Sequence, residues 1–285
     1  MLECLKKKWN NRHPENKQPA ATPTTDYTPG PGAPEGWVEK ALYVTGQFEG
    51  NGYGQISGNF DDQGMSCGIL QHCLGQGSLQ EKILKPFNER YKSPVFDELG
   101  LVDFLQVDIK TAVALGARRV KDANYRSKLR ALLLTPEMIS IQREAAQELG
   151  SKAWKLTKFS FPTHAQPLQF IAFLWFFDVL VQNGSLRGVK MPTENDVQKM
   201  WDHRAREFGK NRVIWMNVQH PHTAYRDLAD VLLCWSINRA KKSHRQWRDD
   251  VVSRKGTIAM GVGTVHGDTH RDIHGLYHTP VEDLI

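Results

Sequence analysis

The stretch from residue 37 to residue 71 most constrains the fold, because its hydrophobic pattern changes abruptly near the middle. Apolar residues recur at helical spacing from Val38 to Phe48, and Pro34 and Glu35 stand just before the first turn. After Phe48 the chain is rich in glycine and alternates in the manner of a β-hairpin. The sequence therefore predicts a helix that ends at Glu49 and leads directly into a hairpin.

Three carboxylates belong to this junction: Glu49 at the helix end, and Asp61 and Asp62 12 and 13 residues later. Desolvation beside Phe48 is expected to keep Glu49 protonated, whereas the polar turn around Asp61 and Asp62 should keep a carboxylate ionised. Glycoside hydrolysis needs such a pair, a proton donor and an ionised base or stabiliser. The alternative is an ordinary helix C-terminus and a non-catalytic hairpin, although an acidic residue at that end opposes the helix dipole.

The order of helix-Glu, hairpin and Asp-x-Gln-Gly-x-Ser-x-Gly-Ile-Leu-Gln resembles the lysozyme-like superfamily of goose-type lysozymes, lytic transglycosylases, phage endolysins and chitosanases. It is most similar to phage and secreted-effector peptidoglycan hydrolases, whose hairpin reads Phe-Asp-Gly-Gln-Gly-x-Ser-x-Gly, and the match is specific over residues 49–71. A chitosanase-like register places Asp61 on the catalytic aspartate, and a goose-type register places Asp62 there. We favour Asp61, because the family often has glycine at the position of Asp62.

The resemblance implies a lysozyme-like fold of the α+β class, mainly α, with the early β-hairpin at the active-site cleft. It implies a muramidase-type peptidoglycan hydrolase without metal or cofactor, which cleaves β-1,4 glycan strands with Glu49 as general acid. Carboxylates on separate elements favour the wide spacing of an inverting enzyme, about 6.5 to 9.5 Å. The alternatives are a chitosanase, a lytic transglycosylase in which Glu49 acts alone, and a non-catalytic wall-binding or tail component. A cognate inhibitor (immunity protein) or delivery machinery would be a further partner.

Residues 168–181 form an apolar run interrupted by Gln169 and Asp178, which is too short and too polar to span a membrane and is expected to be the central buried helix. The resemblance points to Gln182 and Asn183, at its end, as substrate contacts that Asp178 orients or joins. The alternatives are helix capping by the two amides and a buried, hydrogen-bonded Asp178. Two weaker candidates are Tyr53, which would stack on a sugar ring, and Gln71, which would hold water or Asp61.

The net charge of +6 suits a polyanionic surface such as the cell wall. The basic cluster within residues 239–255 contains Asp249 and Asp250 and lacks a nucleic-acid motif, so we expect a solvated helix face and no nucleic-acid partner. Residues 1–36 hold six of the fourteen prolines and should be extended or disordered, which leaves residues 37–285 as the catalytic domain. No secretion signal follows Met1, so we expect synthesis in the cytoplasm and action on the wall after lysis or injection.

Helical patterns further predict helices over 78–91, 122–134, 135–157, 165–182, 194–208, 225–240 and 243–252. The glycine-rich run 254–267 is no phosphate loop and is expected to pack beside the hairpin. The last four histidines are spaced by four residues, which on a helix would allow metal binding. Glycines and a proline argue against a helix there, so we expect no metal at His266, His270, His274 and His278.

Overall fold

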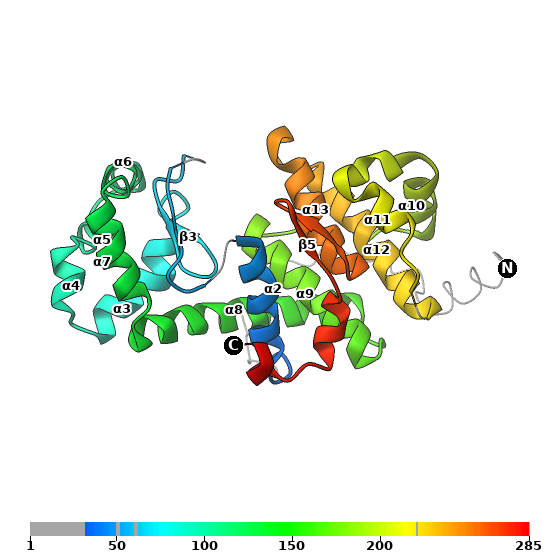
Figure 1. The fold of residues 1–285 in the computed structure, drawn as a ribbon, viewed down its shortest axis with the longest axis horizontal. Helices are drawn as coiled ribbons and strands as arrows, with labels where there is room; N and C mark the ends of the chain where they lie inside the picture. The colour runs from blue at the N-terminus through cyan, green and yellow to red at the C-terminus, as the bar shows by residue number, and fades with distance from the viewer. Residues whose placement is uncertain (1–31, 50–51, 60–61, 221, 285) are drawn as a thin grey trace, which may run out of the picture. The chain divides into compact units, whose positions relative to one another are not determined.

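The computed structural model describes residues 32–49, 52–59, 62–220 and 222–284, with only the main chain of Glu49. Residues Gly32–Ile285 form one compact unit. The described part of this unit is mainly helical and carries two small antiparallel sheets (Figure 1). The expected class, α+β and mainly α, is therefore confirmed. No helix among the described residues is both long and apolar enough to cross a lipid bilayer.

The chain enters this unit through helix α2 (Trp37–Glu49), the helix expected before the hairpin. A three-stranded antiparallel sheet follows, in the order β1 (Ile56–Ser57), β2 (Ser66–Cys67) and β3 (His72–Cys73). Ile56 pairs with Cys67, so residues 58–65 form the loop of the first hairpin. The expected hairpin is thus confirmed, and a third short strand extends it.

Short helices follow the sheet: η1 (Gln80–Leu84, a π-helical segment), α3 (Lys85–Arg90), α4 (Pro94–Glu98), α5 (Asp103–Gln106), α6 (Ile109–Arg119) and α7 (Ala123–Leu133). They share one hydrophobic core with β2 and with the first half of α8 (Pro136–Ser160). The sequence did not predict α4, α5 and α6. They are short, and α6 begins at a local signal, the Asp108 carboxylate that accepts a hydrogen bond from the Thr111 amide at 3.0 Å.

Helix α8 leads from this group of helices to α9 (Gln166–Asn183), and α2 packs against both helices (Figure 1). Gly150 of α8 faces Val38 of α2, and a β-carbon at Gly150 would overlap the valine side chain. Every residue of α9 from Leu168 to Val179 is buried. The prediction of a central buried helix is therefore confirmed, and its apolar composition follows from packing on all sides.

The second half of the chain adds α10 (Glu194–Lys199), η2 (Met200–Arg204), η3 (Ala205–Asn211), α11 (Arg212–Met216), α12 (Thr223–Ala240), η4 (Arg245–Trp247) and α13 (Arg248–Met260). Helices α12 and α13 pack against each other and against α9. The helix predicted over 243–252 extends to Met260, because Gly256 does not break it. The Trp215 ring lies against Gly256 so closely that a β-carbon would overlap it.

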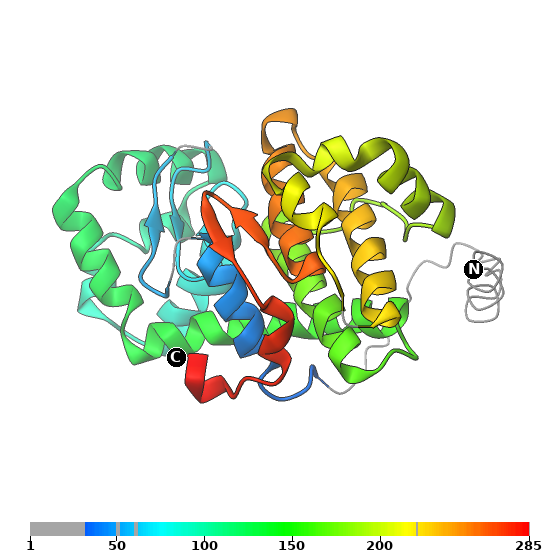
Figure 2. The same ribbon diagram turned by 45° about the vertical axis from the view of Figure 1, so that its right-hand side comes forward.

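A second hairpin, β4 (Gly263–Val265) and β5 (Asp268–His270), follows α13 and precedes η5 (Ile273–Tyr277) and η6 (Val281–Leu284). Its turn consists of His266 and Gly267, whose φ angles are 54° and 103°. Two positive φ angles in a two-residue loop are the signature of a type I′ turn. Figure 2 shows this hairpin beside α2. The run 254–267 is thus part helix and part hairpin.

Candidate functional site

The three predicted catalytic carboxylates lie at or near the junction of α2 and the first hairpin. Glu49 is the last residue of α2, and its side chain lies outside the described part of the structure. Asp61 also lies outside the described residues. Asp62 is described and is exposed in the loop between β1 and β2. Of the three carboxylates, the structure therefore describes the side chain of Asp62, in the hairpin loop. For Glu49 it describes the main chain at the end of α2.

Asp62 does not belong to a strand but to the loop between β1 and β2, in keeping with the polar turn expected around it. Its φ angle is 59°, in the left-handed region. The Asn59 Oδ1 atom accepts a hydrogen bond from the Gly64 amide at 2.6 Å and so closes the loop around Asp62. Gly64 in turn rests on the Val113 main chain of α6, where a β-carbon would approach to 2.7 Å. One side-chain hydrogen bond and one close main-chain contact thus hold Gly64, at the end of the described part of the loop.

Gln142 of α8 holds the base of the first hairpin. This side chain is buried; its Oε1 atom accepts a hydrogen bond from the Ile69 amide at 3.1 Å, and its Nε2 atom donates to the Tyr53 carbonyl at 3.3 Å. The Ile69 side chain lies 3.6 Å from the position of a β-carbon on Gly46 of α2. One amide thus fixes both sides of the hairpin, and Ile69 brings the hairpin against the helix that ends at Glu49.

Tyr53 and Gln71 both lie in or beside this hairpin. The Tyr53 hydroxyl accepts a hydrogen bond from Arg143 Nε at 3.1 Å, and the Arg143 guanidinium lies 5.7 Å from the centre of the ring. Gln71 accepts a hydrogen bond from the Ser57 hydroxyl at 2.5 Å and donates one to the Gly68 carbonyl at 2.8 Å. Gln71 therefore ties β1 to the turn after β2, and Tyr53 is a partly exposed ring with a cation beside it.

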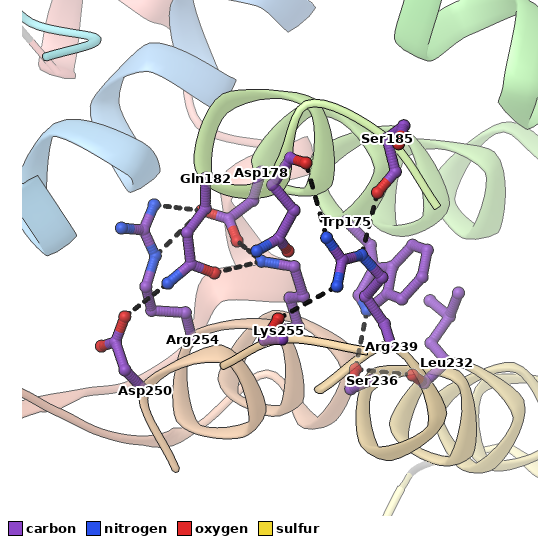
Figure 3. A network of polar contacts seen from close by, with 12 residues as sticks. Trp175, Asp178, Gln182, Ser185, Leu232, Ser236, Arg239, Asp250, Arg254 and Lys255 are labelled. Atoms are coloured by element: carbon purple, nitrogen blue, oxygen red, sulfur yellow. Dashed lines mark hydrogen bonds and ion pairs between the residues drawn. The ribbon is translucent and has the colours of Figure 1, made fainter. Parts of the chain in front are cut away.

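Asp178 is not exposed to solvent, which corrects its prediction as a substrate-contacting residue. It is fully buried in α9, where its Oδ1 atom lies 2.6 Å from Arg254 Nη2 and its Oδ2 atom 2.8 Å from Lys255 Nζ (Figure 3). Burial alone would raise the pKa of Asp178, but these two cations hold it below its ordinary value. Burial also lowers the pKa of Lys255 to about 8, despite Asp178. The alternative of a buried, paired acid is therefore the correct one.

Gln182 continues this network toward Asp250 at the start of α13 (Figure 3). Its Oε1 atom accepts a hydrogen bond from Lys255 Nζ, and its Nε2 atom donates one to Asp250 Oδ2. Asn183 takes part through its main chain, because its carbonyl accepts a hydrogen bond from Arg239 Nη2 at 3.4 Å. The structure thus places Gln182 in the network and Asn183 beside Gly184, the left-handed residue that ends α9.

The basic cluster within residues 239–255 is not a uniformly solvated face, contrary to expectation. Arg239, Arg254 and Lys255 are buried. The Arg239 Nε atom donates a hydrogen bond to the Ser185 carbonyl at 2.9 Å, so the side chain caps the end of α9 from the neighbouring helix α12. The pattern of charges along the sequence predicted that these cations are solvated. Instead, Arg239 donates to a carbonyl at the end of α9, and Arg254 and Lys255 pair with the buried Asp178 carboxylate.

The second hairpin brings two histidines to the end of α2, and sequence reasoning missed both as site residues. The His266 Nδ1 atom lies 3.0 Å from the Phe48 carbonyl oxygen, and its Nε2 atom lies 2.6 Å from Asp250 Oδ1. His270 packs edge-on against the Phe48 ring at 4.9 Å between centroids. The pair His266-Gly267 was the available signal, because a two-residue turn with glycine second favours a hairpin.

The other two histidines of the series make different contacts. The His274 Nε2 atom lies 2.9 Å from the Ile258 carbonyl oxygen, and the exposed His278 packs edge-on against Tyr277. Within the described residues, no group of three His, Cys, Asp or Glu side chains is arranged to hold a metal ion. The four histidines do not share one helix: His266 and His270 lie in the second hairpin, His274 in η5, and His278 directly after η5.

Two surface hollows of the described part lie elsewhere in the molecule. One, of about 430 Å³, is lined by Gln80, Phe104 and Ile109 among others, and one of about 550 Å³ by Trp201, Arg226 and Asp230 among others. Neither is lined by a residue of α2 or of the first hairpin. The candidate site at the end of α2 is therefore described by the contacts of its residues and not by either of these hollows.

No model of a protein family matches the sequence, and no curated protein matches it.

Proposed function

We propose that this protein is a glycoside hydrolase with a lysozyme-like fold, which cleaves the β-1,4 glycan strands of bacterial peptidoglycan. The observation that carries the proposal is the junction of α2 and the first hairpin. Glu49 is the last residue of α2, and the hairpin that carries Asp62 packs against that helix through Ile69 and Gly46. The resemblance of residues 49–71 to the hairpins of peptidoglycan hydrolases supports the same conclusion.

Glu49 acts as the general acid that protonates the glycosidic oxygen as the bond breaks. Its place at the C-terminus of α2 favours the protonated form, because the negative end of the helix dipole disfavours a carboxylate.

The ionised carboxylate comes from the loop of the first hairpin and activates the attacking water. Asp61 and Asp62 are the two candidates, and both are separated from Glu49 by a change of element. An acid on a helix end and a base on a hairpin loop suit an inverting mechanism, in which a water molecule fits between the two carboxyl groups. Tyr53, partly exposed at the hairpin base, is the side chain best placed to stack on a sugar ring.

The decisive variant is Glu49→Gln, because glutamine keeps the shape of the side chain and removes its proton. We expect digestion of purified peptidoglycan to fall at least ~10²-fold, the usual contribution of a general acid. Glu39→Gln is the matched control, since Glu39 lies in the same helix and its Oε1 atom accepts a hydrogen bond from Gln147 Nε2 at 3.1 Å. Activity in a folded Glu49→Gln protein equal to that of the control would refute the assignment of Glu49.

Mass spectrometry of the released fragments identifies the reaction. Reducing-end muramic acid indicates a muramidase, whereas an anhydro-muramic end indicates a lytic transglycosylase with Glu49 as both acid and base. Cleavage of chitosan in place of peptidoglycan indicates a chitosanase. If the wild-type protein sediments with the cell wall and releases no fragment, the protein is a wall-binding component and the catalytic proposal is wrong.

A further inference from the structure

His266 occupies a turn position where the backbone favours another residue. The first position of a type I′ turn has a positive φ angle, and asparagine followed by glycine is its preferred sequence. His266, with φ of 54°, stands where asparagine would be preferred, and Gly267 follows with φ of 103°. The turn alone does not require an imidazole, because asparagine would suit it at least as well, so the contacts of the imidazole are the feature to explain.

The imidazole of His266 contacts the residue directly before Glu49. Because α2 ends at Glu49, the Phe48 carbonyl is one of the terminal carbonyls that have no partner within the helix. The His266 Nδ1–H group donates to this carbonyl at 3.0 Å. The last turn of α2 contains no basic residue of its own, so the second hairpin supplies the donor that this helix end lacks.

Asp250 fixes the orientation of the ring. The His266 Nε2 atom lies 2.6 Å from Asp250 Oδ1, and a carboxylate accepts hydrogen bonds but does not donate them. Both ring nitrogens therefore face oxygen atoms, and the two contacts hold the ring at both of its nitrogens. The other oxygen of Asp250 accepts a hydrogen bond from Gln182, so the carboxylate cannot rotate freely.

The network that holds Asp250 returns to the same residue of α2. Gln182 bonds to Lys255, Lys255 pairs with Asp178, and Asp178 pairs with Arg254. The Arg254 guanidinium lies 5.5 Å from the centre of the Phe48 ring. Phe48 is thus held from two sides, through its main chain by His266 and through its ring by Arg254, by residues of α9, α13 and the second hairpin.

We propose that His266, oriented by Asp250, is a positioning residue that fixes the last turn of α2 and so the main-chain position from which Glu49 acts. The expected effect on catalysis rests on the proposed function, whereas the contact between His266 and the last turn of α2 does not depend on it. The His266 side chain is 54% exposed, and exposed ion pairs contribute about 0 to 1 kcal/mol to stability. A positioning role therefore predicts a loss of activity without a matching loss of stability.

The test is the variant His266→Asn, because asparagine suits the turn and lacks the imidazole. We expect its melting temperature to equal or exceed that of the wild type, whereas the maximal rate of peptidoglycan digestion falls at least ~10-fold with little change in the substrate concentration at half-maximal rate. The control is His278→Asn, which changes an exposed histidine outside this network and should leave the rate unchanged. A double variant with Asp250→Asn should lose no more activity than His266→Asn alone, because both changes act through one carbonyl.

Amide hydrogen exchange tests the structural part without any assay of activity. In His266→Asn the last turn of α2 should exchange faster than in the wild type, and its first turn should not change. Unchanged exchange in the last turn overturns the positioning role, whether or not the protein is an enzyme. Faster exchange together with full activity shows that the contact exists but does not direct catalysis, and this also overturns the proposal. If the wild type releases no glycan fragment, the proposed function fails, and hydrogen exchange alone decides the contact.

Discussion

At the scale of single residues, the backbone torsion of Asp62 identifies it as a residue of the turn. Asp62 adopts a left-handed conformation, with φ of 59°, and its side chain is exposed. Glycine adopts this region without steric cost, and the hairpins that this sequence resembles often carry glycine at the same position. The conformation thus accounts for Asp62 as a residue of the turn and leaves Asp61 as the preferred base.

This account predicts opposite results for the two aspartates. Asp62→Gly should fold normally and retain most of its activity, because glycine accommodates the positive φ angle. Asp61→Asn should reduce peptidoglycan digestion by ~10²-fold, as the loss of a general base does. Initial rates of fragment release, measured beside thermal melts, check both. The reverse order of losses would assign the base to Asp62 and support the goose-type register.

At the scale of elements, α8 holds the first hairpin against α2 through one buried side chain. Gln142 accepts a hydrogen bond from the Ile69 amide and donates to the carbonyls of Tyr53 and Leu133, at 3.1 to 3.3 Å. Gly68, with φ of 81°, passes so close that a β-carbon would overlap this amide. The position of the hairpin is therefore set by a polar contact inside the protein.

Replacing Gln142 should loosen the hairpin and weaken the fold. In Gln142→Leu the buried main-chain groups that it serves lose their partners, at a cost of about 1 to 3 kcal/mol each. We expect a clear loss of unfolding free energy in urea and faster amide exchange at Ile69. Gln147→Leu is the control on the same helix, because Gln147 is exposed. Equal stability of the two variants would show that Gln142 does not hold the hairpin.

At the scale of the whole molecule, two partly buried imidazoles couple stability to pH. Burial lowers the pKa values of His72 and His274 from 6.5 to about 4. Between these pH values the unfolded chain binds protons that the folded chain does not, so stability falls as the pH drops from 6.5 toward 4. Each histidine contributes a slope of up to about 1.4 kcal/mol per pH unit in this window.

The variant His274→Gln isolates one of these contributions. Glutamine can still donate to the Ile258 carbonyl, which His274 Nε2 contacts at 2.9 Å, but it does not titrate. Melting temperatures measured at several pH values should therefore fall less steeply with acid in His274→Gln than in the wild type. His278→Gln, at an exposed position, should keep the wild-type slope. Identical slopes in all three proteins would mean that burial of His274 has no effect on its titration.

Elements with local signals could be predicted before folding. The periodicity up to Phe48 and the glycines after it were sufficient to place the end of α2 at Glu49 and a hairpin behind it. The apolar run 168–181 was sufficient to predict a buried helix, because a helix apolar on every face must be packed on every face. The same local rules failed at Gly256, since glycine weakens an isolated helix but permits close packing against Trp215 in a folded one.

The side chains that meet at the end of α2 come from distant parts of the chain and become neighbours in the folded protein. His266 is 218 residues away from Phe48 in the sequence, and Arg254 and Lys255 are 76 and 77 residues away from Asp178. A hydrophobic pattern records that a face is buried but not which distant residue covers it. The sequence likewise shows that a residue is charged but not which residue pairs with it. Arg239, Arg254 and Lys255 were therefore expected in solvent, although they are buried. Their roles follow from the packing of α9, α13 and the second hairpin, because burial requires each charge to find an opposite charge or a carbonyl.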